Sequence, residues 1–291
     1  MSKLTGLFRK QRGSVGDVTF RQVHGDTIVS EKSTNPAQPR TPAQMRMRVR
    51  WRNIQNLFRA FSGTLHPSFE ARPRNGSDVT AFMSANLGQN PVYLTKSQAE
   101  QGGCVVAPYQ ITRGSLPALN NDIDEGGKVF SSINLGELTI TQDTTVADLA
   151  DAIVTNNEDW HYGDQVSAYV LRQTQNDVTG VPYVAVKAYE VTLDSADATP
   201  LAELLDSPEA FSKTTGGKLG MSVAVDGAVA YVHSRKEASK TRVSTQTLVV
   251  TSNIAGRFTD AAAYTAALLS YGGKLEQPFL TPNIDDVVAP I

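Results

Sequence analysis

The strongest hydrophobic pattern in the chain lies between Thr41 and Leu65 (TPAQMRMRVRWRNIQNLFRAFSGTL). Its apolar residues recur in steps of four and three, which places them on one face of an α-helix. Thr41 is suited to cap this helix and Pro42 to begin it, while Gly63 and Pro67 favour a stop. The predicted apolar seam consists of Met47, Trp51, Ile54, Phe58, Phe61 and Leu65.

Arginines border this seam on both sides. At about 100° per residue, Arg46 and Arg50 lie on one flank, and Arg48, Arg52 and Arg59 lie on the other. Two interpretations remain open. In the first, the helix packs in the core of its own fold, and its arginines are solvated or paired. In the second, it docks onto a partner surface that is apolar in the middle and acidic at the rim. The docking interpretation favours a protein over a phosphate backbone, with Arg46, Arg48, Arg50, Arg52, Arg59, Trp51 and Phe58 as partner-binding residues.

Further elements are expected on either side of the long helix. Alternating apolar residues predict a β-hairpin from strands Ser14–Arg21 and Asp26–Glu31. The proline-containing segment Lys32–Arg40 is typical of an extended linker. Ser77–Leu87 is expected to form a second helix, capped by Ser77.

From Cys104 onward the pattern becomes β-rich, because Val, Tyr and Thr runs alternate with turn residues. Asp226-Gly227 predicts a hairpin turn. The strand candidates are 104–112, 128–133, 136–141, 164–173, 181–193, 219–226, 228–235 and 243–251. Short helices are expected at Val146–Thr155, Pro200–Asp206 and Thr259–Tyr271.

These elements predict an α+β fold. A β-hairpin and a long basic helix precede a mostly antiparallel, Ig-like β-sandwich with short helical insertions, although a mixed α+β layer remains open. Three regions are expected: a basic hairpin and helical region (1–103), a β-sandwich-like domain (104–273) and an extended tail (274–291). The tail either lies along a neighbouring subunit or is disordered.

The charge of the chain is divided between its two ends. The net charge of −2 arises from 27 basic and 29 acidic residues in 291. Residues 1–75 hold 14 Lys and Arg against 4 Asp and Glu, which leaves 13 against 25 for residues 76–291. This division favours head-to-tail contacts between copies or a basic arm on an acidic partner, but it equally permits neutralisation within one molecule.

The sequence offers no catalytic or metal-binding pattern. Its histidines, His24, His66, His161 and His233, are each isolated in sequence, and zinc spacings, G-x-S-x-G elbows, phosphate loops and dinucleotide fingerprints are missing. We therefore expect no enzyme, no cofactor and no metal site. Cys104 is expected to be a buried, small hydrophobic residue. The chain has no apolar run that would span a membrane, and its start lacks a secretory pattern, so no membrane partner is expected.

Binding to nucleic acid is a separate hypothesis. Basic residues are dense in the first 59 positions, with Phe8, Phe20 and Trp51 nearby, and such clusters track phosphates and stack on bases. No zinc finger, RRM or KH pattern accompanies them. A non-specific DNA-binding accessory protein of a phage or host bacterium is therefore the alternative function.

The segment Arg12–Ile54 also carries a recognisable opening. A glycine-marked hairpin is followed by Asn35-Pro36 and then by the run Arg40–Gln44 (RTPAQ) entering the basic helix, with extra residues at Ala37–Pro39. This opening and the segment Val229–Val249 resemble a domain-of-unknown-function family of Bacteroidetes-type gut bacteria and their crAss-like phages. The family has no assigned catalytic activity.

The resemblance implies a structural protein of a tailed phage particle. Such a protein would be a neck or tail ring or connector subunit, in contact with copies of itself and with portal or tail components. It would be made in the host bacterial cytoplasm and reside in the virion. A surface adhesion module is disfavoured, because no export signal is present.

Overall fold

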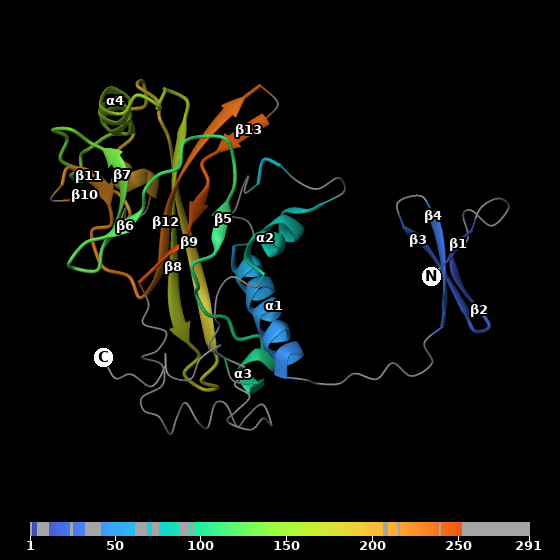
Figure 1. The fold of residues 1–291 in the computed structure, drawn as a ribbon. Helices are drawn as coiled ribbons and strands as arrows, with labels where there is room; N and C mark the ends of the chain where they lie inside the picture. The colour runs from blue at the N-terminus through green and yellow to red at the C-terminus, as the bar shows by residue number, and fades with distance from the viewer. Residues whose placement is uncertain are drawn as a thin grey trace. The chain divides into compact units, whose positions relative to one another are not determined.

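The computed structural model divides the chain into two compact units, Met1–Thr41 and Pro42–Ile291 (Figure 1). Helices and antiparallel sheets are both present, so the fold class is α+β, as predicted. The residues that the structure describes are 2–4, 12–23, 26–32, 42–61, 69–71, 76–87, 94, 96–205, 209–214, 216–238 and 240–251. The predicted helix Thr259–Tyr271 and the tail 274–291 lie outside them.

The first unit is a small antiparallel sheet. The expected pairing of its last two strands is present, with Val18 opposite Glu31 and Val23 opposite Asp26. The expected first strand Ser14–Arg21 is instead two strands, because Gly16 adopts φ +57° and the chain turns there. The order is β1-β4-β3-β2, comprising β1 (Ser2–Leu4), β2 (Gly13–Val15), β3 (Val18–Val23) and β4 (Asp26–Glu31).

A five-stranded antiparallel sheet forms the centre of the second unit. The order along it is β13-β12-β8-β9, and β15 also pairs with β12. Because successive side chains in a strand point to opposite faces, β8 and β12 contribute apolar residues to two separate cores. The strands are β8 (Gln165–Gln175), β9 (Pro182–Thr192), β12 (Gly227–Glu237), β13 (Lys240–Val243) and β15 (Val249–Val250).

One face of the central sheet is covered by a smaller sheet and by α4 (Figure 1). The helix begins where predicted, since Thr145 and Asp148 form a reciprocal capping box at its start. Val146, Leu149 and Ile153 share one core with Val166, Ala168 and Val170 of β8. The elements on this face are α4 (Val146–Asn156), α5 (Leu201–Leu205), and the sheet β10 (Ser212–Lys213), β11 (Lys218–Gly220), β7 (Val129–Asn134) and β6 (Asp122–Ile123).

The opposite face is covered by α1 and α2 (Figure 1). Leu57 and Phe61 of α1 and Phe82 of α2 pack with Tyr169 and Leu171 of β8. This shared core explains why the unit boundary lies at Thr41 and not at the expected residue 103. The elements are α1 (Pro42–Ala60), α2 (Asp78–Asn86, capped by Ser77 as expected), α3 (Lys96–Glu100), β5 (Gln110–Thr112) and β14 (Gln246–Thr247).

Three of the predicted strands are wrong in whole or in part. Residues 136–141 form no strand, only Gln110–Thr112 is a strand in the region predicted as 104–112, and only Lys218–Gly220 in the region predicted as 219–226. The hairpin expected at Asp226-Gly227 is also wrong. Gly227 instead begins β12 where the backbone meets β8, and a Cβ at this position would lie 1.8 Å from the Leu171 oxygen. Glycine is therefore required there by close approach of two strands.

Candidate functional site

Helix α1 turns a different face to the core from the one that its apolar spacing predicts. Met47 and Trp51, which were expected in the seam, are exposed over 42% and 45% of their surfaces. The predicted seam is therefore wrong at these two positions, although Ile54 and Phe61 are buried as expected. Among the side chains of the helix that the structure describes, the buried ones are Val49, Asn53, Ile54 and Leu57, and Phe61 follows directly after it.

A buried amide fixes this rotation of the helix. Asn53 Nδ2 donates to the Val105 oxygen at 2.9 Å and to the Tyr109 hydroxyl at 3.0 Å, and Asn53 Oδ1 accepts from the Val105 nitrogen at 2.8 Å. Because unpaired buried polar groups are costly, these three bonds hold α1 with Asn53 inward. Burial also raises the pKa of Tyr109 well above its ordinary value, so its hydroxyl stays protonated.

The outer face of α1 combines apolar and cationic side chains. Trp51 and Met47 lie beside Arg48, Arg52 and Arg59, all of which are exposed. The three arginines expected on one flank of the seam therefore share the solvent face with the indole ring. We call Met47, Arg48, Trp51, Arg52 and Arg59 the α1 outer face.

The remaining predicted partner-binding residues lie elsewhere. Arg50 is half-buried, and the side chain of Arg46 lies outside the described residues. Phe58 is partly buried, and its ring centroid lies 5.5 Å from that of Phe82 on α2. Its contacts are therefore within the molecule, as expected for an aromatic residue at a helix–helix contact.

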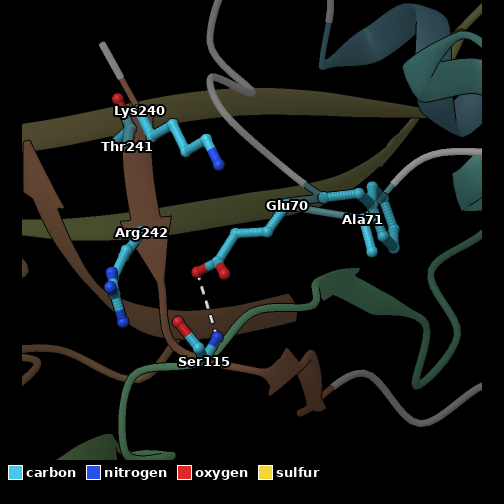
Figure 2. Close-up of a pocket in the computed structure, with 7 residues that line it drawn as sticks. Glu70, Ala71, Ser115, Lys240, Thr241 and Arg242 are labelled. Atoms are coloured by element: carbon cyan, nitrogen blue, oxygen red, sulfur yellow. Dashed lines mark hydrogen bonds between the residues drawn. The ribbon is translucent and has the colours of Figure 1, made fainter. Parts of the chain in front are cut away.

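An open pocket of about 760 Å³ lies between residues 69–71 and β13 (Figure 2). Glu70 points across it and accepts hydrogen bonds at Oε1 from the backbone nitrogens of Ser115, at 3.0 Å, and Val243, at 2.6 Å. Lys240 and Arg242 extend from β13 on the other side, and Arg242 pairs with Glu237 at 2.7 Å.

Glu70 fastens the segment that follows α1 to the sheet. Partial burial would raise the pKa of its carboxyl, but the hydrogen bonds from Ser115 and Val243 and the charge of Arg242 lower it overall. Gly114 leaves room for this contact, since a Cβ there would lie 2.3 Å from Glu70 Oε1. The carboxylate is thus held ionised by structural bonds, an arrangement that suits locking two segments better than transferring a proton.

A second polar cluster is buried beside the start of β8. Asp164, whose side chain is 2% exposed, receives bonds from His233 Nε2 at 2.9 Å and from Arg235 Nε at 2.7 Å and Nη2 at 2.8 Å. Arg235 also donates to the Asp159 oxygen, at 2.7 Å. The Trp160 ring stacks on His233, with centroids 3.8 Å apart and planes at 18°.

This cluster fixes a loop to the sheet. Burial would raise the pKa of Asp164, but hydrogen bonds from Arg235, His233 and the His161 nitrogen hold it well below its usual range. Both oxygens of the carboxylate accept hydrogen bonds, so the arrangement holds a buried ion pair in place. Sequence reasoning missed it because Asp164 and His233 are 69 positions apart and meet only through the pairing of β8 with β12.

The α1 outer face is the candidate binding surface among the residues that the structure describes. Among the described residues, no group of three or more His, Cys, Asp or Glu is arranged to hold a metal ion. Cys104 is buried, as expected. No helix among the described residues is both long and apolar enough to cross a membrane.

Comparisons of the chain with protein-family models, with curated proteins and with solved structures found no match.

Proposed function

We propose that this protein is a non-enzymatic structural subunit that binds its neighbours through the α1 outer face. The observation that carries the proposal is the exposure of Trp51 on the same helix face as Arg52 and Arg59. Tryptophan, methionine and arginine are the residue types enriched at protein interfaces, and tryptophan and arginine dominate their binding energy. A helix face of this composition supports docking onto an apolar patch with acidic borders.

The proposed setting is a tailed phage particle, in which the subunit forms a neck or tail ring or a connector. Its partners would be copies of itself and portal or tail components, and its location the virion. The opening of the sequence (Arg12–Ile54) supports this setting through its resemblance to a phage-associated family. The α1 outer face supports the mode of assembly.

An Ig-like sandwich is our hypothesis for the fold of the β-rich region. Two antiparallel sheets face each other across the core that contains Val129, Leu219 and Tyr231, and this supports it. The helices on the opposite face of the central sheet fit the mixed α+β layer equally well.

Solution mass tests the proposed function directly. Light scattering at low and at high salt should give one large species of fixed copy number, weakened by salt because exposed cations contribute to the contact. Replacing Trp51 by Ala should weaken association about 10-fold or more. Tyr183→Ala is the matched control, because Tyr183 is 48% exposed but lies on β9. A monomer under all conditions would contradict intrinsic assembly and direct the test to other virion proteins.

Non-specific DNA binding is the second candidate, favoured by the exposed Arg48, Arg52 and Arg59 on one helix face. The logarithm of the DNA-binding constant should fall linearly with the logarithm of the salt concentration. Neutralising Arg52 and Arg59 should reduce both the affinity and the slope. An unchanged slope would exclude this face as the DNA contact.

A further inference from the structure

We propose that the α1 outer face of one copy binds the exposed face of α4 on the next copy, in a head-to-tail contact. This inference rests on the proposed function and names its partner surface. Two observations carry it: the surfaces have opposite charge, and they lie on opposite faces of the same sheet.

The segment of the chain that contains α4 carries only acidic charges, and Arg235 lies at its edge, where it donates to the Asp159 backbone oxygen. Between Lys128 and Arg172 the chain contains no lysine or arginine but seven acidic residues. One of these, Asp164, is buried and paired with Arg235. The other six are exposed: Glu137, Asp143, Asp148, Asp151, Glu158 and Asp159.

Two of these acidic residues lie on the solvent side of α4. Val146, Leu149 and Ile153 of α4 face the core, so Asp148 and Asp151 lie on the side opposite. We call Asp148, Asp151, Glu158, Asp159 and Tyr162 the α4 outer face. Tyr162 is 51% exposed, and its hydroxyl donates to Asp151 Oδ1 at 2.9 Å.

The end of α4 attracts cations for a second reason. Its last turn contains no basic residue, and Glu158 and Asp159 follow directly after it. The carbonyl end of a helix is the negative end of its dipole, so these carboxylates add to a field that no cation of the helix offsets. Arginine is the residue best suited to such a site, because it pairs with carboxylates and stacks on aromatic rings such as Tyr162.

The two outer faces are kept apart within one molecule. α1 packs on the side of β8 to which Tyr169 and Leu171 point, and α4 packs on the side to which Ala168 and Val170 point. Their outer faces therefore point away from the central sheet in opposite directions (Figure 1). Within the described residues, Arg52 and Arg59 form no ion pair. Because the central sheet separates them, the α1 outer face and the α4 outer face do not meet within one molecule.

The charges also decide the symmetry of the contact. A two-fold contact through α1 would place arginine against arginine, and one through α4 would place carboxylate against carboxylate. A contact between unlike faces is heterologous, and repetition of a heterologous contact gives a closed ring or an open filament.

Paired charge reversals test the proposal. The first variant carries Arg52→Glu and Arg59→Glu. The second carries Asp151→Lys and Glu158→Lys, which leaves the capping residue Asp148 intact. Each alone sets like charges against each other and should assemble about 100-fold more weakly than the native protein, by sedimentation or light scattering. Mixed in equal amounts, the variants should assemble again. The reversed α1 face of the first variant then meets the reversed α4 face of the second, and the native α1 face of the second meets the native α4 face of the first.

The outcomes separate the proposal from the function on which it rests. Loss of assembly in the first variant with normal assembly of the second would overturn the α4 contact and keep α1 docking. Normal assembly of the first would overturn both. Failure of the mixture to assemble, with both variants folded by circular dichroism, would overturn the pairing, as would a native protein that stays monomeric. Glu125→Lys is the charge control and should assemble normally, because Glu125 is exposed in the turn 124–127 that follows β6.

Discussion

Asn53 on α1 is hydrogen-bonded to both backbone polar atoms of Val105, at 2.8 Å to its nitrogen and 2.9 Å to its oxygen. The pair couples the long helix to the extended segment that precedes β5. Because the amide must point inward, Trp51 is carried to the solvent side of the helix. One polar contact thus sets which residues of α1 remain available to a partner.

Replacing Asn53 by Ala should destabilise the fold. The Val105 nitrogen and oxygen and the Tyr109 hydroxyl would lose their partners in a site that is fully buried. We expect the free energy of unfolding to fall by about 2–4 kcal/mol, measured by urea denaturation. Gln55→Ala, at a half-buried position on the same helix, should change it by less than about 1 kcal/mol. Equal effects of the two substitutions would mean that the amide does not hold the helix.

Trp51→Ala should leave stability nearly unchanged while it weakens association. With 45% of its surface exposed, Trp51 should contribute about 1 kcal/mol or less to folding. Leu57→Ala is the contrasting variant, because Leu57 is fully buried and its loss should cost about 2–5 kcal/mol. Thermal denaturation of the two variants compares them, and a large loss from Trp51→Ala would place the indole in the core.

The helix shows how far hydrophobic spacing predicts a buried face. The repeat of four and three located the helix but placed the seam through Met47 and Trp51, because it counted apolar residues alone. Asn53 is polar and was not counted as a core residue. Only its hydrogen bonds to residues 105–109 show that it is buried. A buried polar anchor made by a distant segment has no signal in local periodicity.

Elements defined by local chemistry were easier to predict. The cap Thr145 and the cap Ser77 each bond within three residues, so the starts of α4 and α2 follow from short sequence patterns. The need for glycine at position 227 arises outside its own segment, because the backbone of Leu171 approaches it closely. The same holds for Asp164 and His233, which are joined by strand pairing and not by sequence spacing.

Gly227→Ala should therefore destabilise the central sheet. The added methyl group would meet the Leu171 oxygen and carbon and force β12 away from β8. We expect a loss of about 1–3 kcal/mol in the free energy of unfolding. Gly216→Ala is the control, since a Cβ there would meet no atom within 4 Å. Hydrogen exchange at the β8 and β12 amides locates the damage, and unchanged protection there would contradict the close approach.

Asp164→Asn should be among the most destabilising substitutions that preserve side-chain size. It removes the charge that Arg235 and His233 share at a site with 2% exposure, so we expect a loss of about 3–5 kcal/mol. Glu237→Gln is the control. It breaks the exposed pair with Arg242 and should cost less than about 1 kcal/mol.

The pH dependence of the Asp164 contribution follows from its lowered pKa. The ordinary pKa of the group is 3.8, and the folded state holds it well below that value. The ionised form is therefore favoured by folding, and its contribution is complete above the unfolded pKa. As the pH falls below about 4, the unfolded state takes up a proton that the folded state resists, so the contribution declines. The stability difference between the native protein and Asp164→Asn should be constant from pH 7 to 5 and shrink below 4. A difference that grows on acidification would reverse the assigned direction and remove the ion pair as its cause.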